Sequence, residues 1–230
     1  MKTYAVVIAG GRIEDDFALG FLDSVRESDP YLIAADGGLA FCARHGIVPD
    51  MAVGDFDSVG VEYARQYLAL HPRVESRFYS WEKDYTDTEI AARKAVEKGC
   101  RRIDFLGATG TRLDHMLGAL QLLSFLLDEG VSGRILDEFN RISLHGEGFR
   151  IWKKQQWGHY VSFFAWGSEV TGLTLKGFHF PMENGHLTSS KTLTVSNQIE
   201  EECAEVRFES GRLLMVESAD HPVNRPADGE

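Results

Sequence analysis

The sequence predicts an α/β domain built on a parallel sheet, followed by an all-β sandwich. From residue 3 to about residue 137, apolar runs of β-forming residues alternate with stretches of helical apolar spacing, as in parallel α/β folds. After that point the helical spacing disappears, and short strand-like runs separated by Gly turns take over. We therefore predict an α/β domain over residues 1–137, a β-sandwich domain over 138–220 and a flexible tail over 221–230.

The elements of the predicted α/β domain follow one another in a regular order. Its strands are the β-rich apolar runs 3–9, 31–35, 51–54, 74–79 and 102–106. Its helices cover residues 15–26, 39–45, 61–71, 87–98 and 113–127. This alternation is typical of a Rossmann-like sheet. The predicted strands of the sandwich are 142–144, 149–152, 160–165, 173–175, 193–195, 205–208 and 213–216.

Composition limits the classes of function. The 230 residues are 43% hydrophobic, which is ample for a packed core. A formal charge of −11 with no basic cluster disfavours nucleic acid and anionic membranes as partners. No apolar run reaches the length of a membrane span, and the amino terminus leads directly into a strand rather than a signal peptide, so we expect a cytoplasmic protein. The cysteines are widely spaced and suggest neither disulfides nor a zinc site.

A pair of carboxylates ends the third predicted strand. Gly54 is followed by Asp55, Phe56, Asp57 and Ser58. If the chain stays extended, the two Asp side chains leave the same face, close enough to share one hard divalent cation. Oxygen ligands of this kind suit Mg²⁺. The alternative interpretation is a solvated acidic turn after a buried strand.

Other loops at strand ends are rich in Gly and polar residues. They are Gly10–Gly11, Asp36–Gly38 and Gly107–His115. Ligands of an open parallel sheet bind beyond the carboxyl ends of its strands, so one ligand could touch all of these loops. Gly-rich turns beside a carboxylate-held cation favour a polyphosphate. The two common Gly-rich nucleotide motifs are nevertheless absent.

The segment Lys83–Glu89 opens the fourth predicted helix. Thr86 and Glu89 have the spacing of a capping box, with Thr86 as the N-cap. Lys83, Asp84 and Asp87 are not needed for a cap, which favours a functional interpretation of these three residues.

Four blocks in this order resemble the signature blocks of thiamine pyrophosphokinases: Asp36–Gly38, Gly54–Ser58, Lys83–Glu89 and Gly107–His115. One position departs from the pattern, because Thr111 stands where many members have Gly. The resemblance implies an α/β domain followed by a β-sandwich, a homodimer, and transfer of pyrophosphate from ATP to thiamine with release of AMP. In the second domain it rests on Ser196 and Asn197, which look like the thiamine-contacting Ser-Asn of the family.

These blocks suggest a role for each candidate residue. Asp55, Asp57 and Asp87 are expected to bind Mg²⁺, with Mn²⁺ as an alternative ion, and they form the predicted catalytic set together with Lys83 and Arg112, which are expected at phosphate oxygens. Asp36 is expected at the substrate or at metal-bound water. The residues expected around ATP are Gly10, Gly11, Asp36, Gly37, Gly38, Asp84, Thr109, Gly110 and Arg112. Thiamine is expected to contact Asp114, Ser196 and Asn197, at a site shared between two subunits.

Several alternatives stay open at this point. His115 either serves the site or only caps and packs its helix, and Ser196–Asn197 is either a thiamine contact or an ordinary turn. Trp152, Trp157 and Trp166 form the sandwich core, or one of them stacks on the thiazolium ring. Two other functions are also considered.

One is a phosphatase that uses Asp-x-Asp, but such an enzyme normally has this pair after the first strand, whereas here the pair follows the third. The other is a non-catalytic nucleotide or thiamine sensor, which has less use for so many carboxylates.

Overall fold

A computed structural model describes residues 2–80, 82, 84–110 and 112–223. The chain divides into two compact units, Met1–Asp137 and Glu138–Glu230. The first unit is α/β with a parallel sheet and the second is all β, which confirms the predicted fold class. No helix within the described ranges is both long and apolar enough to cross a membrane. Lys83, Thr111 and most of the predicted tail, residues 224–230, lie outside the described residues.

In the sheet of the first unit, the order in which strands are added reverses beside the first strand. Its strands are β1 (Tyr4–Ile8), β2 (Tyr31–Ala35), β3 (Met51–Gly54), β4 (Glu75–Phe78), β5 (Arg102–Leu106) and β6 (Ser132–Leu136). They are parallel and lie in the order β4-β3-β2-β1-β5-β6. The chain thus adds β2 to β4 on one side of β1 and then returns to add β5 and β6 on the other. The gap between the ends of β1 and β5 is the topological switch point, where ligands bind in such sheets.

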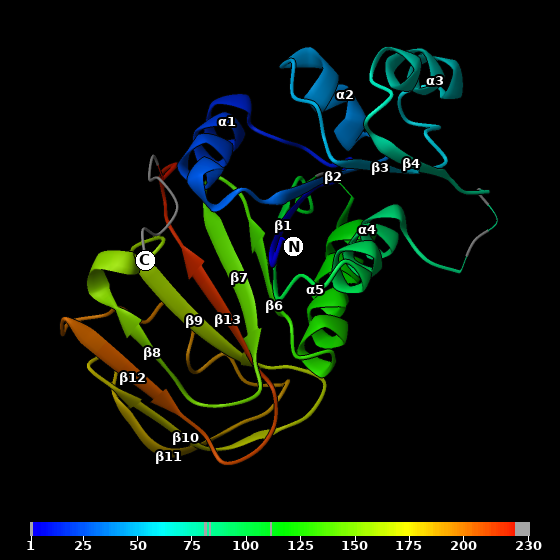
Figure 1. The fold of residues 1–230 in the computed structure, drawn as a ribbon. Coiled ribbons are helices and arrows are strands. Elements are labelled where there is room, and N and C mark those ends of the chain that lie inside the picture. The colour runs from blue at the N-terminus through cyan, green and yellow to red at the C-terminus, as the bar shows by residue number, and fades with distance from the viewer. Residues whose placement is uncertain (1, 81, 83, 111, 224–230) are drawn as a thin grey trace. The chain divides into compact units, whose positions relative to one another are not determined.

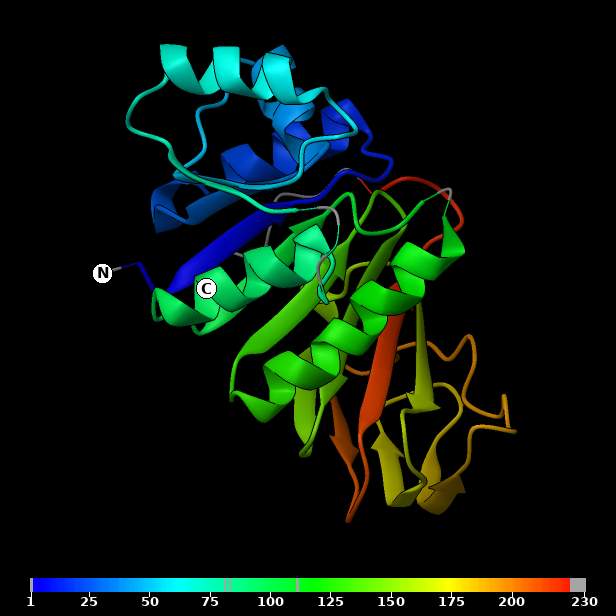
Figure 2. The same ribbon diagram turned by 90° about the vertical axis from the view of Figure 1, so that its right-hand side faces the viewer.

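Helices cover both faces of this sheet. They are α1 (Asp15–Ser24), α2 (Gly38–Arg44), α3 (Val61–Leu70), α4 (Asp87–Glu97) and α5 (Leu113–Asp128), with a short 3₁₀ turn, η1, at Arg26–Ser28. Figures 1 and 2 show α1, α2 and α3 on one face and α4 and α5 on the other. Burial on both faces explains why β1 is apolar and buried at every position.

The second unit is a sandwich of antiparallel strands. They are β7 (Asn140–His145), β8 (Phe149–Trp152), β9 (Tyr160–Ala165), β10 (Val170–Lys176), β11 (Met182–Leu187), β12 (Cys203–Arg207) and β13 (Leu213–Ser218), with the 3₁₀ turn η2 at Lys153–Gln155. One layer has the order β7-β13-β9 and the other β11-β10-β12-β8. Alternate residues of each layer enter one core, such as Val161 and Phe163 from β9 and Leu173 and Leu175 from β10.

The structure corrects three details of the prediction. Strands β6 and β11 are present although the sequence patterns do not predict them. The strand predicted at 193–195 is absent from the described chain, which forms a turn there, closed by Val195 N–H donating to Thr192 O at 3.2 Å. Leu193 in this turn is 70% exposed, so its apolar side chain does not mark a buried strand.

Candidate active site

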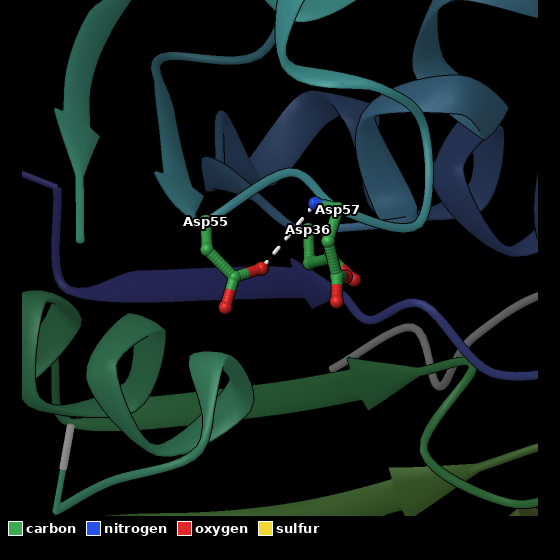
Figure 3. A group of neighbouring side chains, drawn as sticks. All are labelled: Asp36, Asp55 and Asp57. Atoms are coloured by element: carbon green, nitrogen blue, oxygen red, sulfur yellow. Dashed lines mark hydrogen bonds between the residues drawn. The ribbon is translucent and has the colours of Figure 1, made fainter. Parts of the chain in front are cut away.

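Three carboxylates lie together at the carboxyl ends of β2 and β3. Asp36 directly follows β2, and Asp55 and Asp57 come just after β3. Each offers one oxygen, and these oxygens lie within 4.8 Å of one another (Figure 3). Because β2 and β3 are neighbouring parallel strands, their ends meet at the same edge of the sheet. Asp36 therefore joins the predicted Asp-x-Asp pair.

The chain does not stay extended between the paired carboxylates, so the condition for both side chains to leave one face of a strand is not met. Phe56 lies between them with φ of 58°, in the left-handed region that bulky residues rarely adopt. The backbone N–H of Asp57 donates to Oδ1 of Asp55 at 3.3 Å, the contact two residues along the chain that is typical of an Asx turn (Figure 3). A turn, rather than one face of a strand, brings the two carboxylates together.

Asp36 has one oxygen that suits a cation. Its Oδ2 accepts a hydrogen bond of 2.5 Å from the hydroxyl of Ser58. Its Oδ1 is buried and has no hydrogen-bond partner among the described residues. A buried carboxylate oxygen is costly unless it is bound, and a donor set made only of oxygens is the kind that Mg²⁺ prefers. The residues present therefore fit a hard divalent cation.

A cavity of about 350 Å³ adjoins this acidic group. Asp36 and Ser58 contribute to its wall, and most of the remaining wall comes from the ends of β1 and β5 and the first turns of α4 and α5. It therefore lies at the switch point of the sheet. The lining residues that were predicted around ATP are Gly10, Gly11, Asp36, Thr109, Gly110 and Arg112.

Asp87 lines the same cavity as the first residue of α4. In the described part of the chain, however, the acidic group that could share one ion consists of Asp36, Asp55 and Asp57, without Asp87. Thr86 is the N-cap of α4, since its side chain accepts a hydrogen bond of 3.2 Å from the backbone N–H of Glu89. The predicted cap is thereby confirmed.

The glycines of the strand-end loops have a clear packing role. Gly11 N–H donates to Gly107 O at 2.9 Å, and a Cβ on Gly11 would clash with that same oxygen. A Cβ on Gly38 would clash with the carbonyl oxygen of Ile8. Only glycine allows backbones to approach so closely. The loops after β1 and β5 therefore touch backbone to backbone, and α2 begins directly against the end of β1.

Arg112 and Asp114 pair with each other at the start of α5. The Arg112 guanidinium donates to both Asp114 oxygens, at 3.2 and 2.6 Å. This hydrogen bonding lowers the pKa of the Asp114 carboxyl below its usual value. Both side chains are exposed, and Arg112 and the neighbouring His115 line the cavity. The residues predicted for phosphate and for thiamine are thus partners in this structure.

Asp84 is exposed in the segment that precedes α4. Lys83 and Thr111 lie outside the described residues, so the structure gives no contact for either.

Ser196 and Asn197 belong to the second unit and differ in their surroundings. Asn197 is 2% exposed, and its side chain accepts from Phe180 N–H at 3.0 Å and donates to Phe180 O at 2.8 Å. These contacts give Asn197 a structural role in holding its loop. Ser196 is exposed, with φ of 58°, and its N–H donates to Ser162 Oγ at 2.9 Å. Of the two side chains, that of Ser196 is the one presented to solvent.

Ser58 is a site residue for which the sequence predicts no role of its own. Its hydroxyl donates to Asp36, and its side chain lines the cavity. The Gly54–Ser58 block contains it, but nothing in the block alone connects a hydroxyl there to a carboxylate 22 residues earlier.

Comparisons with known proteins agree over both units. A family model described as "Thiamin pyrophosphokinase, catalytic domain" matches residues 15–132, and one described as "Thiamin pyrophosphokinase, vitamin B1 binding domain" matches residues 149–213. The chain is 32% identical over 220 residues to a curated thiamine pyrophosphokinase of Bacillus subtilis, which covers 96% of this chain and 100% of the relative.

Solved structures give the same result. The fold is similar to the crystal structure of the thiamine pyrophosphokinase from Bacillus subtilis, with a TM-score of 0.84 and 31% identity over 94% of this chain and 99% of that one. It is also similar to the thiamin pyrophosphokinase from Geobacillus thermodenitrificans, with a TM-score of 0.80 and 30% identity over 94% of this chain and 98% of that one.

Proposed function

The chain belongs to the thiamin pyrophosphokinase family and is a transferase, and from that membership we propose that it moves pyrophosphate from ATP to thiamine, giving thiamine diphosphate and AMP. The observation that carries the proposal is the acidic group of Asp36, Asp55 and Asp57 beside a cavity at the switch point of a parallel sheet. We expect the reaction in the cytoplasm.

The acidic group is the proposed cation site. Asp36, Asp55 and Asp57 would hold Mg²⁺, or Mn²⁺ as an alternative ion, and Asp87 faces the same cavity from α4. The cation, when bound, supplies positive charge that neutralises phosphate oxygens of ATP. The carboxylates themselves fix where that charge lies, which matters because the chain as a whole is strongly negative.

The walls of the cavity are proposed to receive the phosphates. Gly10, Gly11, Thr109 and Gly110 lie on its wall. Backbone N–H groups of such turns can donate hydrogen bonds to anions, although that of Gly11 already donates to Gly107 O. Arg112 is on the same wall, and a phosphate would compete with Asp114 for its guanidinium. Once a phosphate had taken its place on Arg112, the Asp114 carboxylate would be available to orient thiamine or its hydroxyl. Lys83, Gly37, Gly38 and Asp84 stay proposed contacts of ATP by resemblance.

The proposed reaction is a single in-line transfer. The thiamine hydroxyl oxygen bonds to the β-phosphorus, while the bond from that phosphorus to the oxygen bridging the α-phosphate breaks. The electron pair stays on AMP, and the hydroxyl proton passes to water. Because the transition state of phosphoryl transfer is loose, positioning and charge neutralisation by the side chains carry most of the catalysis, and no dedicated base is required.

The second unit is proposed to bind thiamine, which the family match over residues 149–213 supports. Ser196 is the proposed contact, because its side chain is exposed, whereas the buried Asn197 would act by holding the loop. We further propose a homodimer in which the α/β unit of one chain and the β unit of its partner share each site.

One assay tests the reaction. The full chain is incubated with ATP, Mg²⁺ and thiamine, and the products are separated by chromatography. AMP and thiamine diphosphate in equal amounts are the expected result. Release of inorganic phosphate without thiamine diphosphate would identify a phosphatase, and ligand binding without either product would identify a sensor. Either of these results would overturn the proposal.

A further inference from the structure

Phe56 combines two features that rarely occur in one residue. It has φ of 58°, a left-handed conformation that costs energy for any residue with a bulky side chain. Its side chain is also fully buried, at 0% exposure. Residues held in strained conformations persist only when their surroundings over-determine them, and they cluster at functional sites. Phe56 fits this description, because Asp55 and Asp57 flank it.

The ring of Phe56 is anchored on the edge of the sheet. Its centroid lies 4.9 Å from that of Phe78, with the two rings tilted by 58°. Phe78 is the last residue of β4 and is in register with Gly54, the last residue of β3. The backbones stay joined one residue further, since Tyr79 N–H donates to Gly54 O at 3.0 Å. The aromatic contact therefore lies where the chain leaves β3 for the acidic group.

We propose that Phe56 is a positioning residue for the cation, because burial of its ring holds the left-handed turn that directs Asp55 and Asp57 toward Asp36. Without that anchor, a residue with a Cβ relaxes to negative φ. Such a change rotates the peptide plane between Phe56 and Asp57 and carries the Asp57 carboxylate away from the other two. This inference rests on the proposed function, because it assumes that the acidic group binds a divalent ion.

The test measures ion binding rather than catalysis. Mn²⁺ is titrated into the full chain without nucleotide or thiamine, and the free ion is followed by electron paramagnetic resonance. Phe56→Leu keeps an apolar side chain but removes the ring. The matched control is Phe21→Leu, since Phe21 is 1% exposed on α1, a helix that contributes no lining residue among those described. Melting temperature is recorded for every variant.

We expect both substitutions to lower the melting temperature, but only Phe56→Leu to weaken Mn²⁺ binding, by about 10- to 100-fold, as for other residues that support metal ligands. Phe78→Leu, at a position 46% exposed, should weaken it in the same direction and serves as the second variant if Phe56→Leu does not fold. Unchanged Mn²⁺ affinity in a folded Phe56→Leu or Phe78→Leu chain would overturn the proposed role of Phe56 but leave the proposed cation site standing. A parent chain that binds no Mn²⁺ would overturn the cation site as well.

Discussion

At the scale of single residues, Asp57 offers the most direct test of the acidic group. Its side chain is exposed, so Asp57→Asn removes one charge without disturbing the core. We expect turnover in Mg²⁺ to fall on the order of 100-fold or more, because charge on the phosphates would be less well neutralised. Steady-state rates of thiamine diphosphate formation measure this, and Mn²⁺ should restore part of the loss.

The matched control is Asp23→Asn on α1, where the side chain is 82% exposed and distant in sequence from every strand-end loop. That variant should keep the parent's rate and melting temperature. Full activity of Asp57→Asn in Mg²⁺ would show that this carboxylate does not serve the cation.

His145 predicts a pH dependence of stability in the second unit. It is the last residue of β7, and its Nε2 is 2.9 Å from Ser143 Oγ. Its ring stacks on that of Phe149 with the ring centroids 3.8 Å apart. Burial lowers its pKa from 6.5 to about 4. Between these values the unfolded chain is protonated at this ring and the folded chain is not, so this contribution to stability is present above pH 6.5 and is lost as the pH falls toward 4.

The expected loss between pH 7 and pH 5 is about 2 kcal/mol from this one group. Urea unfolding at the two pH values measures it in the parent and in His145→Gln, which keeps a polar side chain near Ser143 but does not titrate. The parent should lose about that much more stability than the variant. Equal losses would mean that the ring is not buried in its neutral form.

At the scale of elements, the cap of α4 tests how the cavity wall is held. Thr86→Ala removes the oxygen that accepts from Glu89 N–H, and we expect a loss of about 1 kcal/mol in unfolding free energy. Thr86→Ser keeps an oxygen in the same place and should retain most of the stability. Chemical unfolding of the three proteins compares them, and a Thr86→Ala protein as stable as the parent would argue against the cap.

Helices and strands were predictable where apolar periodicity was strong, and their prediction failed where glycine interrupted that periodicity. β6 has Gly133 at its second position, and a Cβ there would meet Leu123 and Leu126 of α5, so close helix packing removed the β signal. β11 contains Asn184 and Gly185, residue types that normally indicate a turn, and Asn184 indeed has φ of 49°. In both strands the tertiary contacts outweigh local preference.

The sequence predicts which loops form the candidate site, but not which of their side chains lie together. The strand-end rule correctly brings Asp55 and Asp57 near the loop of Asp36. It cannot show that Asp36 rather than Asp87 completes the group, because that depends on the adjacency of β2 and β3 and on left-handed residues. The hydrogen bonds that bury Asn197 are likewise absent from any local pattern.

At the scale of the whole molecule, the shared-site proposal predicts complementation between inactive chains. Asp57→Asn disables the first unit, and Ser196→Asn places a larger side chain at the proposed thiamine contact while tolerating φ of 58°. Each homodimer should be inactive. Mixed dimers would contain one site with both changes and one with neither, so a randomised mixture should regain about a quarter of the parent's activity.

A second pair provides the control. Asp57 and Asp87 lie in the same unit, so mixing Asp57→Asn with Asp87→Asn leaves a change in every site and should restore nothing. If mass spectrometry verifies dimers of Asp57→Asn with Ser196→Asn and these stay inactive, each site belongs to a single chain.

The backbone contact between Gly11 and Gly107 has a consequence for the thermodynamics of binding. Ordering a loop around a ligand costs about 1–2 kcal/mol of conformational entropy for each residue fixed. Here the loops after β1 and β5 are already tied together by a hydrogen bond of 2.9 Å. Folding has therefore preorganised both walls of the cavity, and more of the energy of phosphate contacts remains as affinity. The Gly11 amide hydrogen should accordingly exchange with solvent slowly even before a nucleotide arrives.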